Sequence, residues 1–82
     1  MSSFNLNTYV IGGPENIEER HLLPSETKSE ALVRFVDIFS SLGLDVFQLR
    51  FKNSSDDDFL KLANEIVQVL KNTNCKLCIN AV

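Results

Sequence analysis

The chain alternates between two hydrophobic periodicities, and this alternation restricts its fold more than any other feature. Three short segments are apolar, or alternate apolar with polar side chains, as β-strands do: residues 7–12, 45–51 and 76–80. Two longer segments repeat apolar residues at helical spacing: residues 27–42 and 56–72. Strands that alternate with helices favour a parallel sheet with right-handed crossovers. We therefore predict one α/β domain over residues 1–82, with the order β-α-β-α-β.

Local signals mark the ends of the predicted helices. Thr27 and Glu30 have the spacing of a capping box at the start of the first helix, and Ser25 is a competing N-cap. Gly43 is suited to end that helix, because glycine adopts the left-handed conformation at low cost. Ser55 is suited to cap the second helix. These signals predict where the chain leaves one element and enters the next.

Two motifs contain metal-ligating residue types, but their spacing favours structural roles. Cys75 and Cys78 form a C-x-x-C pattern, yet positions three apart on a strand point to opposite faces. The single histidine, His21, lies far upstream, and a zinc site needs further ligands. The acidic run 56–58 would lie in the first turn of a helix, where the helix dipole favours negative charge. Metal ligation by this run is the alternative, although adjacent carboxylates at a helix start do not converge on one point.

Composition argues against several classes of protein. The net charge is −3 over 82 residues, and no basic stripe exists to neutralise the phosphates of a nucleic acid. Hydrophobic residues make up 44 %, but no apolar run approaches the roughly 20 residues that span a bilayer. The first residues have neither the basic nor the apolar region of a secretory signal. We therefore expect a cytoplasmic protein that binds neither nucleic acid nor membrane.

The segment "DVFQLRFKN" carries the strongest sign of a binding site. One side of this predicted strand is apolar: Phe47, Leu49 and Phe51. The other side carries an amide and two cations: Gln48, Arg50 and Lys52. Ligands of parallel sheets gather at the carboxyl ends of the strands, where Asn80 would also lie on the third strand. Two cations and an amide donor at this place predict a site for phosphate or diphosphate.

These residues resemble a known family. "VFQLRFKNSS", followed by an acidic-capped helix and "KLCIN", is similar to the N-terminal portion of thiamine-phosphate synthase, and the resemblance covers roughly residues 7–80. The resemblance implies the first three strands of a TIM (β/α)8 barrel, whose outer strand faces lie under helices and whose site lies at the carboxyl ends of the strands. The related TenI-like thiazole tautomerases share the fold but often lack the counterparts of Gln48 and Lys52.

The resemblance also implies a reaction and a role for each site residue. The family couples hydroxymethylpyrimidine diphosphate to thiazole phosphate and releases diphosphate, with Mg²⁺ as cofactor. The counterparts of three residues contact the pyrimidine diphosphate: Gln48, Arg50 and Lys52. The counterpart of Asn80 contacts the pyrimidine. Arg50 and Lys52 would then be the catalytic residues, stabilising negative charge on the leaving group, while Gln48 and Asn80 orient the substrate.

The chain departs from the family in two ways. The family places a magnesium-binding aspartate directly after the asparagine, and this position is Ala81 here. A complete barrel needs roughly 200 residues and eight strands. We therefore expect a partial domain that is weakly active or inactive alone, and we consider a non-catalytic remnant or a small phosphate-binding module as the alternative. An incomplete sheet has open edges, through which copies could self-associate.

Overall fold

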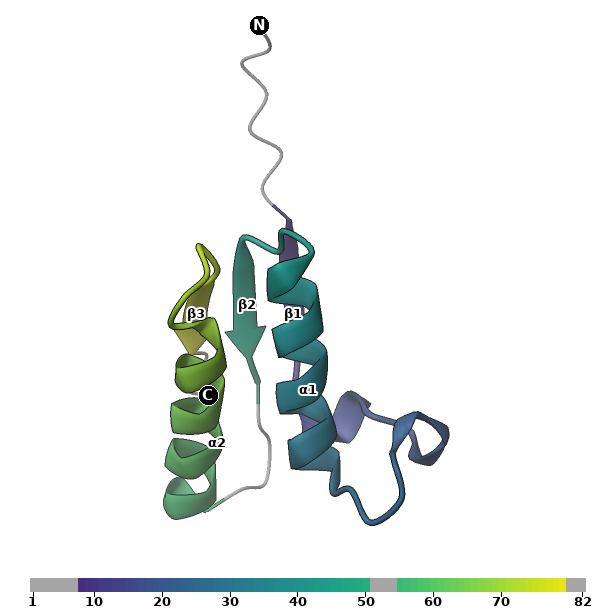
Figure 1. Cartoon of the computed structure of the whole chain (residues 1–82). Coiled ribbons are helices and arrows are strands. Elements are labelled where there is room, and N and C mark those ends of the chain that lie inside the picture. Colours follow the sequence, from purple (N-terminus) through teal and green to yellow (C-terminus); the bar gives the residue numbers. More distant parts are fainter. Residues whose placement is uncertain (1–7, 51–54, 80–82) are drawn as a thin grey trace, which may run out of the picture.

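The computed structural model describes residues 8–50 and 55–79, which form an α/β unit (Figure 1). Its strands and α-helices follow the predicted order: β1 Tyr9–Gly12, α1 Lys28–Ser41, β2 Val46–Leu49, α2 Asp56–Leu70 and β3 Lys76–Ile79. Two 3-10 helices lie between β1 and α1: η1 Pro14–Asn16 and η2 Glu19–His21. The order β-α-β-α-β is therefore confirmed, and both α-helices are slightly shorter than the periodicity predicted.

The described strands form a parallel sheet in the order β1-β2-β3. Val46 of β2 pairs with Tyr9 of β1 and with Lys76 of β3, and the same register continues along the strands. Both α-helices cover the same face of this sheet (Figure 1). The other face carries no helix in the described part of the chain, and we call it the helix-free face.

The core lies between the helices and the central strand. Phe47 and Leu49 of β2 are buried, at 2 % and 0 % exposure, and they face the helices. The helices contribute their apolar stripes to this core: Ala31, Leu32, Val36, Leu62, Ala63, Ile66 and Leu70. The prediction that Phe47 and Leu49 lie beneath the helices is therefore confirmed. The same prediction for Phe51 falls outside the described residues.

The helix ends follow the predicted caps. Thr27 Oγ1 accepts a hydrogen bond from the Glu30 amide, and the Glu30 carboxylate accepts one from the Thr27 amide. Ser25 is not the cap; its φ of 65° places it in a turn before the helix. Ser55 Oγ accepts from the Asp58 amide at the start of α2. Gly43, at a φ of 104°, adopts the left-handed conformation expected after α1.

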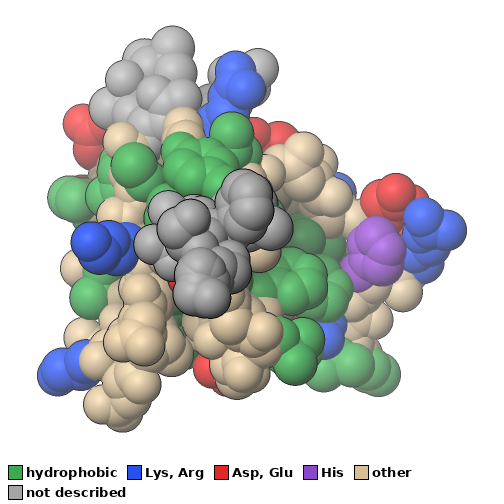
Figure 2. Space-filling model, turned by 90° about the horizontal axis from the view of Figure 1, so that it is seen from above, with side chains coloured by type: hydrophobic (Ala, Val, Ile, Leu, Met, Phe, Trp, Pro, Cys, Tyr) green, Lys and Arg blue, Asp and Glu red, His purple; other side chains and the backbone are tan. Residues whose placement is uncertain are grey.

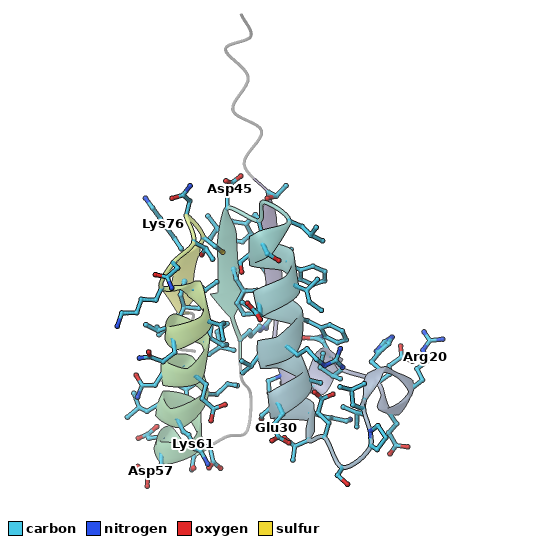
Figure 3. The ribbon with its side chains drawn as sticks, in the orientation of Figure 1. Arg20, Glu30, Asp45, Asp57, Lys61 and Lys76 are labelled. Atoms are coloured by element: carbon cyan, nitrogen blue, oxygen red, sulfur yellow. The ribbon has the colours of Figure 1, made fainter. Side chains whose placement is uncertain are left out.

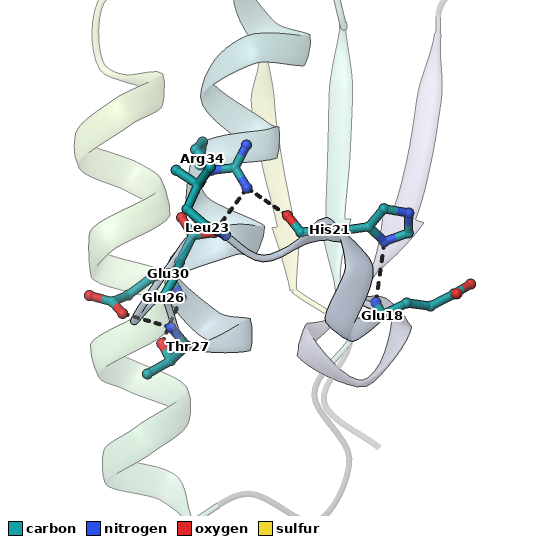
Figure 4. Close-up of polar contacts among 7 residues, drawn as sticks. All are labelled: Glu18, His21, Leu23, Glu26, Thr27, Glu30 and Arg34. Atoms are coloured by element: carbon teal, nitrogen blue, oxygen red, sulfur yellow. Dashed lines mark hydrogen bonds and ion pairs between the residues drawn. The ribbon is translucent and has the colours of Figure 1, made fainter.

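An ion pair fastens the segment between β1 and α1 to the side of α1. Arg34 donates from Nε and from a terminal nitrogen to the two carboxylate oxygens of Glu26, both at 2.9 Å, as Figure 4 shows. The same guanidinium donates to the His21 carbonyl, and Glu26 accepts from the Leu23 amide. Arg34 also lies over the ring of Phe35, 4.8 Å from its centroid. This network holds the segment between β1 and α1 against the side of α1, although the only helical turns of that segment are the short η1 and η2.

Hydrophobic side chains reach the surface at the sheet edge and along α1. Tyr9 and Ile11 of β1 are 50 % and 55 % exposed, and Leu42 after α1 is 78 % exposed. A view from the amino ends of the strands shows such side chains among the charged ones at this end of the molecule (Figure 2). Among the described residues, no helix has both the length and the apolar character to cross a membrane.

Candidate functional site

The helix-free face carries the polar side chains that the sequence predicted for a ligand site. Strand register places Gln48 beside Ile11 of β1 and Cys78 of β3, on the face opposite Phe47 and Leu49. Gln48 is half-buried, whereas Ile11 and Cys78 are exposed. The predicted separation of the amide from the apolar side of β2 is therefore confirmed.

The carboxyl ends of β1 and β2 meet in a tight corner. The Arg50 amide donates to the Gly12 carbonyl at 2.9 Å, which continues the sheet beyond the last residue of β2. Gly13 approaches the next strand so closely that a Cβ there would lie 1.8 Å from the Arg50 carbonyl oxygen. The Gly13 amide donates to the side-chain oxygen of Asn16, which starts the turn of η1. This corner fixes the backbone from which the Arg50 side chain extends.

A small depression opens beside this corner. It has a volume of about 230 Å³ and is lined by Ile11, Glu15, Asn16 and Arg50. Arg50 is exposed and, among the described residues, is the one cation that lines the depression, while Glu15 supplies the opposite charge. An anion bound here would therefore approach from the side of Arg50 and Gln48, away from Glu15.

The second described cation of this face lies at the other end of the sheet. Lys76 opens β3, and its amide donates to the Asp45 carbonyl at 2.9 Å. Figure 3 shows Lys76 and Asp45 near each other at the amino ends of the strands. Lys76 thus shares the face of Gln48 but not the end where Arg50 lies.

A wider hollow between the amino ends of the two α-helices is a poorer place for an anion. It measures about 470 Å³, and its ionisable lining consists of Glu30, Asp58, Glu65 and Lys61. Three carboxylates outnumber one ammonium, so the hollow repels phosphate rather than attracting it. Asp58 belongs to the acidic run 56–58, which lies in the first turn of α2 as the sequence predicted.

The described residues do not fit a magnesium site. Among the described residues, Glu15 is the single carboxylate that lines the depression, and the Asn16 side-chain oxygen already accepts from the Gly13 amide. Within residues 8–50 and 55–79, no group of three or more His, Cys, Asp or Glu side chains could hold a metal ion. Cys75 is buried and Cys78 is exposed, both as free thiols.

Two predicted site residues lie outside the description. Lys52 and Asn80, together with Ala81, fall in the undescribed segments. Sequence reasoning also missed three residues that build the corner: Gly13, Glu15 and Asn16. A pair of glycines at a strand end, such as the "GGP" after the first strand, can signal this kind of close backbone contact.

Comparison with known protein-family models, curated proteins and solved structures finds no match to this chain.

Proposed function

We propose that the chain forms the first three strands of a barrel of the thiamine-phosphate synthase type and binds the diphosphate group of hydroxymethylpyrimidine diphosphate. The observation that carries this proposal is the position of Gln48 on the helix-free face, with Arg50 two residues further on, directly after the carboxyl end of β2. The amide and the guanidinium together offer hydrogen-bond donors and one fixed positive charge to an anion.

The arrangement of the described elements supports the barrel part of the proposal. A (β/α)8 barrel keeps helices outside its strands and turns the other face of each strand inward. Two helices on one face of a parallel sheet, with strands in chain order, agree with that requirement. In such a barrel Gln48 would face the interior, and Arg50 would stand at the mouth where barrel enzymes bind their substrates.

The proposed chemistry is a substitution at the methylene carbon of the pyrimidine. The bond from this carbon to the diphosphate oxygen breaks, and the electron pair leaves with diphosphate. The lone pair of the thiazole nitrogen then forms the new bond to the same carbon. Arg50 would stabilise the charge that develops on diphosphate, and Gln48 would orient the substrate. The resemblance assigns charge stabilisation to Lys52 as well, and pyrimidine contact to Asn80.

A phosphate-binding module without catalysis is the second candidate. The helix-free face of the described sheet is open, and Tyr9 and Ile11 on it are half exposed. Diphosphate at such a site would remain in contact with water, so the charge of Arg50 would be strongly screened. We therefore expect the 82-residue chain to bind diphosphate weakly, with an affinity that falls as salt is added.

Titration with inorganic diphosphate, followed by amide chemical shifts, tests the proposal. We expect shifts at Gly13, Gln48 and Arg50 that saturate with diphosphate and are smaller with sulfate. Arg50→Ala should abolish them. Lys76→Ala, which removes the same charge from the other end of the same face, should leave them in place. Equal loss in both variants, or a wild-type chain without shifts, would contradict a site at the carboxyl end of β2.

A further inference from the structure

The side chain of Gln48 is held from the neighbouring strand by the one tyrosine of the chain. Tyr9 opens β1 and lies on the helix-free face, diagonally across from Gln48 in the parallel register. Its phenol donates a hydrogen bond to Oε1 of Gln48. This contact joins two residues that the chain separates by the whole of α1, and it occupies the acceptor atom of the Gln48 amide.

The contact determines which end of the amide a ligand meets. A glutamine amide has an oxygen that accepts hydrogen bonds and a nitrogen that donates two. Because the Tyr9 phenol donates to Oε1, the Nε2 group keeps both of its hydrogens for other partners. An anion needs donors, and an amide turned the other way would present its oxygen and repel the anion.

We propose that Tyr9 is a positioning residue of the diphosphate site, which holds the Gln48 amide with its N–H groups toward the ligand. This inference rests on the proposed function, since it names the residue that prepares the same site for an anion. Tyr9 does not itself touch the ligand in this arrangement. It acts through the orientation of Gln48.

The surroundings of Tyr9 keep its phenol protonated and therefore able to donate. Partial burial raises the pKa of the Tyr9 phenol above its usual value, and negative charge on the neighbouring Cys78 sulfur raises it further. Cys78 lies on the far side of Gln48 in the strand register, so the three side chains cross the sheet on one face. The other described ionisable groups at this face are the cations Lys76 and Arg50 and the carboxylate of Glu15, which lines the depression beside Arg50.

The first test asks whether the hydrogen bond exists in solution. The chain has one tyrosine and no tryptophan, so the ultraviolet absorbance of the phenolate reports on Tyr9 alone. Gln48→Leu removes the acceptor, and we expect the pKa of Tyr9 to fall, because the bond stabilises the protonated phenol. Gln68→Leu removes the same amide from the exposed side of α2 and should leave the titration unchanged. An unchanged titration in Gln48→Leu would overturn the inference.

The second test asks whether the bond serves the ligand. Tyr9→Phe keeps the ring and removes the hydroxyl, and we expect the affinity for inorganic diphosphate to fall about 2- to 10-fold, the range that one hydrogen bond covers. Gln48→Leu should weaken binding at least as much. The double variant should be no weaker than Gln48→Leu alone, because Tyr9 acts through Gln48.

The outcomes separate this inference from the proposed function. The positioning role would be overturned if Tyr9→Phe kept full affinity for diphosphate, or if the fold-losses of affinity of the two single variants multiplied in the double variant. In either case, diphosphate binding by the wild-type chain would still support the proposed function. A wild-type chain that does not bind diphosphate would overturn the function and the ligand role of Tyr9 together. The Tyr9 titration is independent of diphosphate, so it would still report whether the bond itself is present.

Discussion

Arg34 and Glu26 are joined at two points, with each carboxylate oxygen of Glu26 2.9 Å from a different nitrogen of the guanidinium. Glu26 is nearly buried at the side chain, with 11 % exposure, and Arg34 is at 30 %. The pair lies where the segment between β1 and α1 reaches α1 (Figure 4). Its loss should therefore loosen the connection and leave the sheet in place.

Acid should release this connection before it unfolds the core. The hydrogen bond from Arg34, followed by the one from the Leu23 amide, lowers the pKa of Glu26 below its usual range. A lowered pKa means that the pair contributes stability above the ordinary carboxyl range and loses it as the pH falls through the lowered value. Hydrogen exchange at Leu23 should accelerate in that window. Arg34→Ala should produce the same acceleration at neutral pH, whereas Arg20→Ala, which removes an exposed pair with Glu18, should not.

Leu49→Ala should destabilise the fold strongly. Leu49 is fully buried, and truncation of a buried leucine costs about 2–5 kcal/mol through lost burial and the cavity left behind. Its register partner Ile79 is 49 % exposed and provides a matched control. Chemical denaturation should show a large loss for Leu49→Ala and a small one for Ile79→Ala. Similar losses would show that the core is not centred on β2.

Gly13→Ala should destabilise the fold, although the backbone conformation of Gly13 suits any residue. Gly13 has an extended backbone, with a φ of −151°, so the cost comes from the new methyl group meeting the Arg50 carbonyl oxygen. Relief requires a backbone shift, and overpacking of this kind costs about 1–3 kcal/mol. Gly12→Ala is the control, because the nearest atom to its methyl group would be 3.8 Å away. Denaturation of both variants, with diphosphate titration of Gly13→Ala, measures the effect on fold and site.

The chain should self-associate through the edge and face of β1. Tyr9, Val10 and Ile11 are exposed on a strand that pairs on one side only within the described sheet. Light scattering should show a mass that rises with concentration, and Ile11→Lys should suppress the rise. Val67→Lys alters an equally apolar, 45 % exposed position on α2 and should not. A constant monomer mass at high concentration would contradict the prediction.

The 82-residue chain alone should not form thiamine phosphate at a useful rate. Holding two substrates together can lower a barrier by about 7–11 kcal/mol, but that gain needs a pocket for each. The described carboxyl end offers one depression, of about 230 Å³. The assay contains the pyrimidine diphosphate, the thiazole phosphate and magnesium. Product that disappears in Arg50→Ala would show instead that the chain, as an oligomer, assembles a working site.

The sequence predicted those features that depend on near neighbours. The caps at Thr27 and Ser55 follow from residues three positions apart, and the faces of β2 follow from strict alternation. Contacts between distant segments were not predicted. The Tyr9–Gln48 hydrogen bond depends on how β1 and β2 align, which no local pattern specifies. The close approach of Gly13 to Arg50 depends on the same alignment.

The segment between β1 and α1 shows a second limit of prediction from the sequence. Its two 3-10 turns were not predicted, because such turns are too short to create a periodic pattern. The contact between Glu26 and Arg34 joins a residue before the start of α1 to a residue within the helix, eight positions further on. Neither the helix spacing nor the capping box required that contact.

The central position of β2 has a consequence for how the chain folds. Each pairing in the described sheet joins β2 to a strand from which a whole helix separates it, and β1 and β3 do not pair with each other. The pairing of β1 with β2 and the pairing of β2 with β3 each close a loop that contains a helix, and both pairings require β2 to be in position. The folding nucleus should contain β2 with the helix faces above it. Truncations at Phe47 and Leu49 should then slow folding, whereas changes on β1 or β3 should mainly accelerate unfolding.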